Sequence, residues 1–450
     1  MMSDAPAQAH ATGSRAGRLY ALFWRWHFIT GFFAAPILAI VALTGAALVF
    51  QDEVHPLVYP HLDLAAVTGT TVSLDAQLAA VQAAFPHDEV SSLTIYPPGS
   101  GRTTVAMLHM HNTGGDWLNP WNMAWAYVDP GTGEVVGSLT ASQDIFEVVT
   151  TLHKSFFALL PGQLLVDLAT SWGVISILAG LYLWWPRRAS AVWGVWLPRL
   201  RGGIRLILRD LHTVPALYFT PVALVVSISG VLLGLSAAPE LLAVLVSGQL
   251  PQELLFAPKS EPAPGQPPAT LDSVVGGLGP HPAHAPYVVA IPHDANSSYM
   301  VWYAMHADPE QFRQAVVDQY SGEITVDYRP ADIPLVGRLY YVLIFNEVLH
   351  RGTYWGLLGK VLTFLASLLV AGMCVTAVWL WWLRTGARRL GIPRVAPDIR
   401  APRWASTTLI ISVVLLPLTG LSWLVLAALR RLATAAHGRF ARRFVNRDSS

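Results

Sequence analysis

Five long apolar segments dominate this chain, and they constrain its fold more than any other feature. Each reaches the roughly 20 apolar residues that a helix needs to cross a bilayer, and only the second contains a charge, Asp167, near its start. Only 13% of the chain is charged, against roughly 25% in soluble proteins. We therefore predict a mainly α-helical membrane protein with spans at Phe28–Phe50, Leu164–Trp185, Val214–Ala238, Val361–Leu383 and Trp404–Leu429.

Basic residues predict which side of the membrane each loop occupies, because Lys and Arg accumulate on the cytoplasmic side. Residues 1–26 hold three Arg and the loop 186–213 holds six. Residues 51–152 hold one basic residue against eleven acidic ones, and residues 236–349 hold four against twelve. We predict a cytoplasmic N-terminus and two outer segments. The basic tail 430–450 conflicts with a fifth crossing, so the topology of the last span stays open.

Regular spacings indicate an internal repeat. His27 and His212 both fit the pattern H-x8-P-x7-[ST]-G, offset by 185 residues, and His153 and His350 both precede spans that end in Trp-Trp, offset by 197. In the outer segments "TTVAMLHM" matches "YMVWYAMH", and "YVDPGTGEVVG" matches "VVDQYSGEITV". Alternating apolar residues with Asp and Gly at the turns are typical of hairpins in small α+β domains. We predict two copies of a helix–outer domain–helix unit, with a fifth span appended.

Three motifs resemble a known family. They are the duplicated "VDPGTGEV" hairpin, the "LHK" and "LHR" segments before spans ending in "LYLWWPRR" and "LWWLR", and the opening "WRWHFITGFF". Over about residues 18–390 the chain resembles PepSY-associated transmembrane proteins, an iron-uptake-linked family that includes inner-membrane siderophore reductases. The resemblance implies a bacterial inner-membrane protein that binds haem in its helices and passes electrons outward to ferric chelates in the periplasm.

The four repeat-related histidines are candidate haem ligands. A pseudo-two-fold axis along the membrane normal would bring His27 to face His212 at the cytoplasmic side and His153 to face His350 at the outer side. Two facing imidazoles suit one haem iron, and helix bundles commonly hold cofactors between facing helices. A lone interfacial histidine is more often solvated or bonded to a carbonyl, so a structural role stays open. We predict two b-type haems, since no C-x-x-C-H attachment motif is present.

The returning segments are too long for straight spans. From His153 to Trp185 is 32 residues, or about 48 Å of helix against a hydrocarbon core of about 30 Å. We expect a break at Pro161–Gly162 in the first copy, and in the second copy at Gly352, Gly356 and Gly359. The pairs Thr44–Gly45 and Ser229–Gly230 lie near the outer ends of their spans, where they would admit a flat macrocycle or simply allow close helix packing.

A second set of residues is a candidate substrate surface. Met107, His109 and His111 share one strand face and could contact a soft metal or an iron chelate. Trp117, Trp121 and Trp125 could stack on an apolar chelate, although outward aromatic residues also anchor proteins at the membrane interface. A surface strand and an aromatic anchor are the structural alternatives.

The function that these features predict is a di-haem transmembrane oxidoreductase. It would pass electrons from the cytoplasmic or membrane side to ferric siderophores or other ferric chelates and release iron as Fe(II). No Gly-rich dinucleotide fingerprint or Walker motif is present, so the donor would be a quinol or a cytoplasmic reductase, and no nucleic-acid partner is expected. The alternatives are a non-redox PepSY regulatory or anchoring protein that binds a peptidase or peptide, and a secondary transporter with midplane sites.

The predicted order along the chain follows from the spans and their polarity. It is cytoplasmic segment 1–26, first span 27–50, PepSY-like domain 51–152, rim and second span 153–185, basic loop 186–211, third span 212–238, PepSY-like domain 239–349, rim and fourth span 350–383, basic loop 384–403, fifth span 404–429 and tail 430–450.

Overall fold

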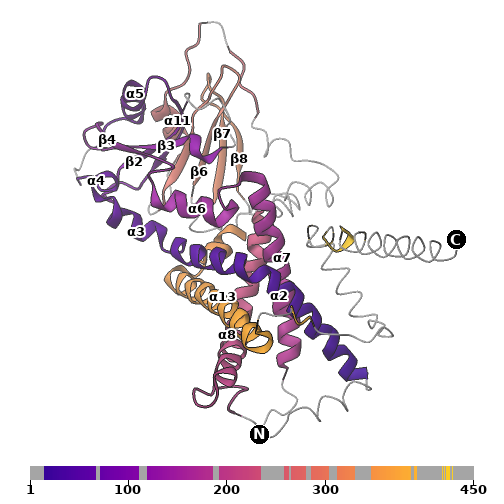
Figure 1. The fold of residues 1–450 in the computed structure, drawn as a ribbon. Helices are drawn as coiled ribbons and strands as arrows, with labels where there is room; N and C mark the ends of the chain where they lie inside the picture. The colour runs from indigo at the N-terminus through magenta and orange to yellow at the C-terminus, as the bar shows by residue number, and fades with distance from the viewer. Residues whose placement is uncertain are drawn as a thin grey trace, which may run out of the picture. The chain divides into compact units, whose positions relative to one another are not determined.

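The computed structural model describes most of the chain. The described residues are 15–66, 71–110, 119–185, 192–234, 258–262, 265–279, 285–303, 312–329, 346–386 and 390–392, with a few positions between 418 and 428. The chain divides into two compact units, each made of separated stretches (Figure 1). Unit 1 comprises Met1–Ala39, Gln163–Ala237 and Leu369–Ser450, and unit 2 comprises Ile40–Gly162 and Ala238–Leu368.

Among the residues that the structure describes, four helices are long and apolar enough to cross a membrane, which confirms four of the predicted spans. They are α2 (Arg15–Leu48), α7 (Leu159–Trp184), α8 (Ile204–Leu233) and α13 (Gly356–Thr385). The fifth predicted segment, Trp404–Leu429, lies largely outside the described residues. Within it, the Ser422 hydroxyl accepts a hydrogen bond of 3.1 Å from the indole of Trp172 in α7.

The first returning segment is broken into two helices, a few residues earlier than expected. Helix α6 (Ile145–Ser155) ends where Phe156 and Phe157 adopt φ values of 50° and 60°, in the left-handed region. Pro161 and Gly162 instead lie in the first turn of α7. A Cβ on Gly162 would overlap the carbonyl of Ser155. The glycine therefore allows the two helices to approach closely, and the left-handed residues turn the chain.

Glycines break the second returning segment. Residues 346–351 are helical, Gly352 and Gly356 have φ values of 72° and 56°, and α13 then begins. A Cβ on Gly352 would crowd the carbonyl of Gly359, and a Cβ on Gly359 would crowd that of Gly352. Both returning segments thus change direction between the histidine and the span.

Strands from the two outer segments form one antiparallel sheet rather than two separate ones. Its eight strands follow the order β4-β3-β2-β1-β5-β6-β7-β8, so β1 and β5 pair at the centre. The strands are β1 (Glu89–Ile95), β2 (Thr104–His109), β3 (Met123–Val128), β4 (Val135–Thr140), β5 (Tyr287–Ala290), β6 (Tyr299–Tyr303), β7 (Arg313–Val317) and β8 (Ile324–Tyr328).

The register of this sheet corrects one of the sequence matches. Leu93 lies opposite Ala106 in the first half, and Val289 lies opposite Val301 in the second. Ala106 therefore corresponds to Val301, whereas the match of "TTVAMLHM" with "YMVWYAMH" paired it with Trp302. A shift of one residue turns every side chain to the other face, and Ala106 and Val301 are both fully buried in the core.

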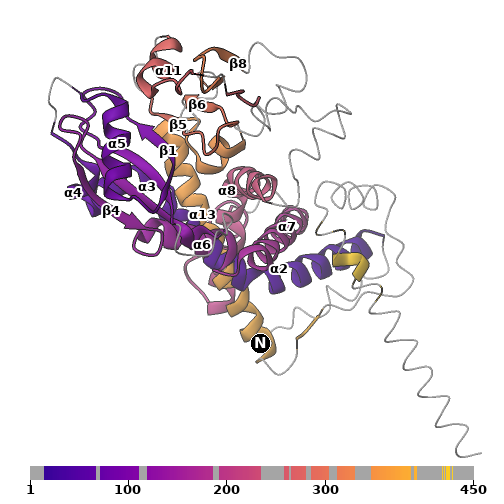
Figure 2. The ribbon, with the colours of Figure 1, turned by 90° about the horizontal axis from the view of Figure 1, so that it is seen from above.

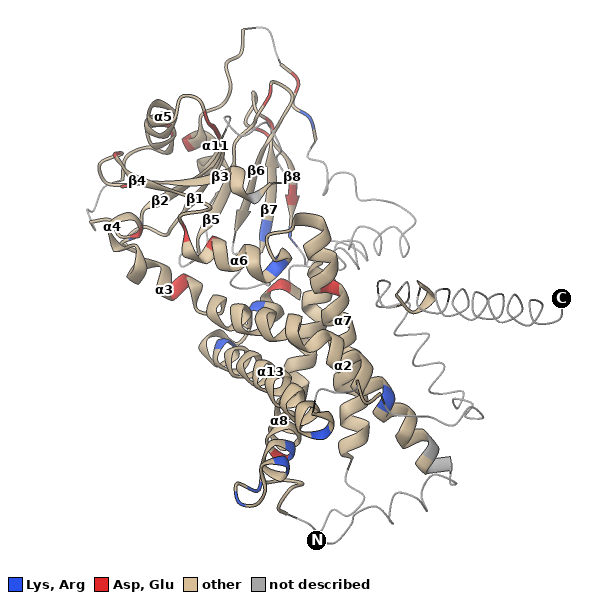
Figure 3. Ribbon diagram, in the orientation of Figure 1, with Lys and Arg blue, Asp and Glu red and all other residues tan. Residues whose placement is uncertain are grey.

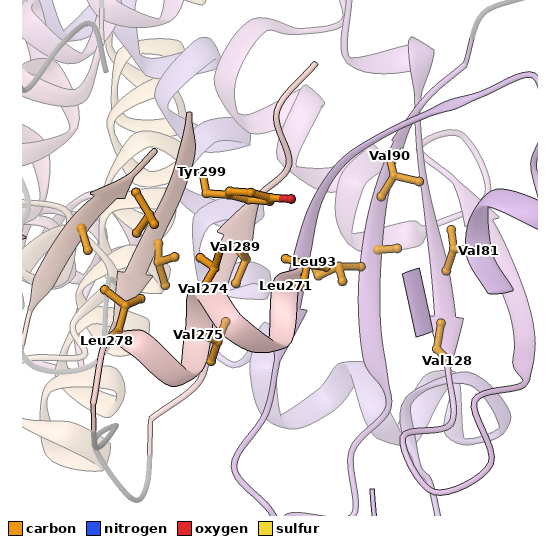
Figure 4. Packing of buried hydrophobic residues seen from close by; sticks show 14 of the residues in the cluster. Val81, Val90, Leu93, Val128, Leu271, Val274, Val275, Leu278, Val289 and Tyr299 are labelled. Carbon is orange, nitrogen blue, oxygen red and sulfur yellow. The ribbon is translucent and has the colours of Figure 1, made fainter. Parts of the chain in front are cut away.

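The core lies between the sheet and two short helices on one face. These are α5 (Leu74–Ala84), beside the strands of the first half, and α11 (Leu271–Gly277), beside those of the second (Figure 2). Val81 and Leu271 from these helices pack with Leu93 and Val289 from the central strands (Figure 4). Three further helices belong to the same unit: α3 (Gln51–Val58), α4 (Pro60–Asp63) and α6.

The starts of α5 and α11 stabilise each other. The carboxylate of Asp272 accepts hydrogen bonds from the amides of Leu74 and Asp75 at 3.0 and 3.2 Å. The carboxylate of Asp75 accepts from the amides of Leu271 and Asp272 at 2.9 and 3.1 Å. Each helix thus satisfies the free N-terminal amides of the other, which neither could do with its own N-cap alone.

Candidate functional site

The structure brings His27 of α2 and His212 of α8 together within unit 1. Their ring centres are 6.2 Å apart, with an angle of 72° between the planes. The Nδ1 of His27 lies 2.8 Å from the carbonyl oxygen of Ser176 in α7 and 3.1 Å from its hydroxyl. That hydroxyl donates to the His27 carbonyl at 3.3 Å, so both Ser176 oxygens accept from Nδ1–H.

His212 is held in the same way by α13. Its Nδ1 lies 3.1 Å from the carbonyl oxygen of Met373 and 3.1 Å from the hydroxyl of Thr376. The Thr376 hydroxyl donates to the carbonyls of Gly372 and Met373, so its oxygen accepts from the imidazole. A proton held on Nδ1 leaves the lone pair on Nε2. Both rings are therefore oriented as neutral metal ligands usually are.

His153 of α6 and His350 of the helix 346–351 form a second pair within unit 2. Their ring centres are 6.3 Å apart, with an angle of 49° between the planes. The Nδ1 of His153 donates to the carbonyl of Val41 at 2.9 Å and to the hydroxyl of Thr44 at 3.1 Å. Burial, together with the facing His350, lowers the pKa of His153 to about 4. Its imidazole is therefore neutral at pH 7, as a metal ligand must be.

Two glycines make room for these rings. A Cβ on Gly180 of α7 would lie 3.0 Å from Cε1 of His27, and a Cβ on Gly45 of α2 would lie 3.0 Å from Cε1 of His153. Thr44 and Gly45 thus support the His153 ring, a role that neither of the sequence-based interpretations included. Ser229, in the matching position of α8, is buried and donates to the Val226 carbonyl of its own helix at 3.0 Å.

The spacing of both pairs fits one iron between two imidazoles. A metal–nitrogen bond of about 2 Å, with roughly 1.1 Å from that nitrogen to the ring centre, separates two opposed rings by about 6 Å. No cluster of three or more His, Cys, Asp or Glu side chains suited to a metal ion occurs among the described residues. A metal that brings its own equatorial ligands needs only two protein ligands. Each pair supplies two imidazoles, which is the number of axial ligands that a haem iron takes.

Charged side chains surround the start of α13, next to the second pair. Lys360 is buried and pairs with Glu53 at 2.7 Å and with Asp52 at 3.7 Å. Arg351, the residue after His350, lies 3.2 Å from Asp52. These ion pairs connect the helix 346–351 and the start of α13 to the beginning of α3.

The candidate substrate residues are distributed over two places. Met107 and Trp125 are direct cross-strand neighbours on β2 and β3, and His109 lies opposite Met123 on the same strands. Burial lowers the pKa of His109. Trp121, in the short 3-10 helix Pro120–Asn122, stacks on Phe157 with ring centres 5.8 Å apart. His111 and Trp117 lie outside the described residues.

The supporting residues Ser176, Gly180 and Thr376 were not identified from the sequence. Each is a small or hydroxyl-bearing residue inside an apolar span, which is the signal that could have drawn attention to it. That signal does not show which histidine such a residue meets, because the hydrogen bonds join residues 149 and 164 positions apart.

Comparison with known proteins identifies the family. The profile of the PepSY-associated TM region matches residues 24–384, a stretch that contains all four paired histidines. No curated protein matches the chain at a significant level. Together with the four apolar helices, the match shows a multi-pass membrane protein. The chain belongs to the PepSY-associated TM family.

Proposed function

We propose that this protein is a di-haem transmembrane oxidoreductase that reduces ferric siderophores or other ferric chelates. The observation that carries the proposal is the presence of two facing imidazole pairs with ring centres 6.2 and 6.3 Å apart. In the first pair and at His153, Nδ1 is held by a backbone carbonyl and a hydroxyl. A purely structural histidine has no need of a second imidazole at this distance.

The roles of the residues follow from this geometry. His27 and His212 would hold one b-type haem, and His153 and His350 would hold the other. A haem with two axial imidazoles carries one electron at a time and offers no vacant iron position to a substrate. The chain itself holds the rings in place and keeps them neutral. It needs no acid or base at the iron, so we assign no catalytic residue.

The sheet supports the proposed topology. Strands β1 to β4 lie between α2 and α7, and strands β5 to β8 lie between α8 and α13, yet they form one sheet. Both outer segments must therefore be on the same side of a membrane, which requires an even number of crossings between them. Helices α7 and α8 provide two.

Charge supports the assignment of sides. Arginines gather where α8 begins and where α13 ends, and the Arg205 side chain donates to the Leu383 carbonyl at 2.7 Å (Figure 3). Because basic residues favour the cytoplasm, we place this end inside and the sheet in the periplasm of a bacterial inner membrane. Electrons would then move outward from a quinol or a cytoplasmic reductase.

The strand order also favours an origin by duplication. Outward from β1 and from β5, the strands follow the same sequence of antiparallel neighbours. The turns after β3 and β7 are alike as well: the carboxylate of Asp129 accepts from Gly131 and Thr132 amides, and that of Asp318 accepts from Tyr320 and Ser321 amides. We propose two copies of a helix–outer segment–helix unit, followed by a fifth span.

The acceptor would be reduced by one electron from Fe(III) to Fe(II), and the chelator would then hold the iron less tightly. A haem iron held by two histidines would have no free position for a ligand, so contact with the chelate would be through surface residues. Among the described residues, Trp121, Trp125 and His109 remain the candidates for this contact. His111 and Trp117, which lie outside the described residues, remain candidates from the sequence.

The spectrum of the purified protein tests the proposal. We expect a Soret band, sharp α-bands after reduction and about two haems per chain. In sealed vesicles with pre-reduced haems, a ferric siderophore added on the side of the sheet should reoxidise them, and the same chelate added on the side of the basic loops should not. Protein without a Soret band would instead favour a regulatory or anchoring role, with binding to a peptidase or peptide.

A further inference from the structure

A buried charged cluster connects α3 to the beginning of α6. His55 of α3 lies between two carboxylates: its Nδ1 is 2.5 Å from Asp63, and its Nε2 is 3.3 Å from Asp144. Arg102 approaches the other oxygen of Asp63 at 3.3 Å. Asp63 and Asp144 are almost completely buried. Nothing in the proposed electron transfer uses this cluster.

The geometry shows which proton state the cluster requires. An ionised carboxylate only accepts hydrogen bonds, so both nitrogens of His55 must carry a proton to bond both aspartates. With His55 charged, two positive and two negative groups balance. With His55 neutral, the buried cluster carries one excess negative charge, which is costly away from water.

The same residues fix the N-terminus of α6. The second oxygen of Asp144 accepts from the Phe146 amide at 2.8 Å and caps the helix. The Tyr59 hydroxyl, which follows α3, accepts from the Ile145 amide at 3.0 Å and donates to the Gln143 carbonyl at 3.2 Å. The bond of His55 to Asp144 and the two bonds of the Tyr59 hydroxyl therefore hold the start of α6 against α3 and the residue that follows it.

Helix α6 is thus attached to the α2–α3 segment at both ends. Near its C-terminus, His153 donates to Val41 and Thr44 of α2. At its N-terminus, Asp144 bonds His55, seven residues beyond the last residue of α2. The left-handed residues that follow α6 separate it from α7. The orientation of the His153 ring therefore depends on both attachments.

We propose that His55, as an imidazolium between Asp63 and Asp144, is a positioning residue that sets the orientation of His153 through α6. This inference rests on the proposed function, because the orientation matters when His153 is an axial ligand.

The cluster also predicts a pH dependence. Burial alone would lower the pKa of His55, but the hydrogen bonds to Asp144 and Asp63 outweigh it and raise the pKa to about 9. The contact is therefore complete below the ordinary histidine pKa and is lost as pH rises through about 9. The ionisable groups around His55 are Asp63, Asp144, Arg102, Glu147, Tyr59, Tyr96 and Tyr127.

Hydrogen exchange of purified protein tests the anchoring without relying on haem. In His55→Gln, the amides of α6 should exchange roughly tenfold faster or more, because a hydrogen bond to a charged group is lost. Asp144→Asn keeps an oxygen for the helix cap but removes the charge, so it should show a smaller increase. His61→Gln, an exposed histidine in α4, is the matched control and should change nothing.

Electron paramagnetic resonance tests the positioning. The variants His350→Ala and His212→Ala first identify which signal belongs to which haem, because each removes one of them. In His55→Gln, the signal of the haem at His153 and His350 should shift, because it depends on the angle between the imidazole planes. The signal of the haem at His27 and His212 should stay constant. In the wild type the same shift should occur as pH passes about 9, a titration that needs no variant. If His55→Gln speeds hydrogen exchange in α6 without shifting the signal, the cluster has only a structural role and the proposal is overturned. If neither hydrogen exchange nor the signal changes, the proposal is overturned as well. Protein that binds no haem would contradict the proposed function instead.

Discussion

The two histidine pairs have almost equal ring separations but very different supports. His27 and His212 lie on α2 and α8, helices of 34 and 30 residues, and each is held by a further long helix. His153 lies on an 11-residue helix that ends in left-handed residues, and His350 lies on the helix 346–351, just before Gly352. The same imidazole chemistry is thus built into two kinds of scaffold.

The two kinds of support determine which contacts set the orientation of each histidine ring. A ring on a continuous transmembrane helix moves only if the helix moves, so its orientation is fixed by packing along the whole span. A ring on a short helix is fixed by a few local contacts, such as those of Thr44 and of the His55 cluster. We expect the first pair to resist changes at the surface and the second pair to respond to them.

The largest effect should follow from removing a ligand. His212→Ala should remove about half of the bound haem and leave the second pair intact, and His350→Ala should do the reverse. In each variant the iron of the altered pair keeps only one protein ligand. Haem content and α-band spectra measure this. His87→Ala, an exposed histidine after α5, is the control. Equal loss of both haems in either variant would mean that the two sites do not form independently.

A smaller effect should follow from filling the space beside a ring. Gly180→Ala places a methyl group 3.0 Å from Cε1 of His27, and the long helices cannot move apart easily, so we expect haem retention at the first pair to fall severalfold. Gly372→Ala, in α13 with nothing within 4 Å of the added Cβ, is the matched control. Gly45→Ala crowds His153 in the same way but should be tolerated better. A stronger loss in Gly45→Ala would reverse the comparison.

Removing a supporting hydroxyl should distinguish the scaffolds further. Removing a hydrogen-bond partner of a metal-binding histidine commonly lowers the metal affinity by about 10-fold or more. Here a backbone carbonyl still accepts from Nδ1, so we expect the haem affinity to fall by up to about tenfold. Thr44→Val should have the larger effect because α6 offers His153 few other supports, and Thr376→Val should have the smaller one. Competition with apomyoglobin for haem gives both values. A larger effect in Thr376→Val would argue against local control of the second pair.

Charge substitutions should produce the smallest effects, on the order of tens of millivolts for partly screened charges. Lys360→Met removes the cation 2.7 Å from Glu53 and leaves Asp52 with Arg351, so the reduction potential of the second haem should fall. Arg384→Met removes the cation 4.9 Å from the Phe28 ring centre, next to His27, and should lower the potential of the first haem only. Spectroelectrochemical titration separates the two. A lower reduction potential of the first haem in Lys360→Met, or of the second haem in Arg384→Met, would contradict the assignment of the pairs.

Hydropathy and spacing were enough to predict four of the spans and to pair the histidines. Both signals are carried by residues close together or by a constant offset, and the rings of His27 and His212 do face each other. Each of these four helices begins before its predicted span. In α8 the added residues include Arg209 and Asp210, which form an ion pair of 3.0 Å and carry no apolar signal.

Contacts between distant segments could not be predicted. The pairing of β1 with β5, the exchange of caps between Asp75 and Asp272, and the bonds of His55 all depend on how the chain returns on itself. No local pattern distinguishes a histidine that bonds two aspartates from one that faces water, as His61 does. The one-residue error between β2 and β6 has the same origin: similarity of sequence does not fix a register, but burial does.

The central pairing of β1 with β5 has a consequence for biosynthesis. Leu93 and its partner Val289 are separated by 289 − 93 = 196 residues, so at 5–20 residues per second the first half of the sheet waits roughly 10 to 40 s for its partner strand. During that time α7 and α8 must be inserted, and the edge of β1 is unpaired and open to association with other chains. The assembly of this protein should therefore depend on translation speed and on chaperones of the compartment that receives the first outer segment.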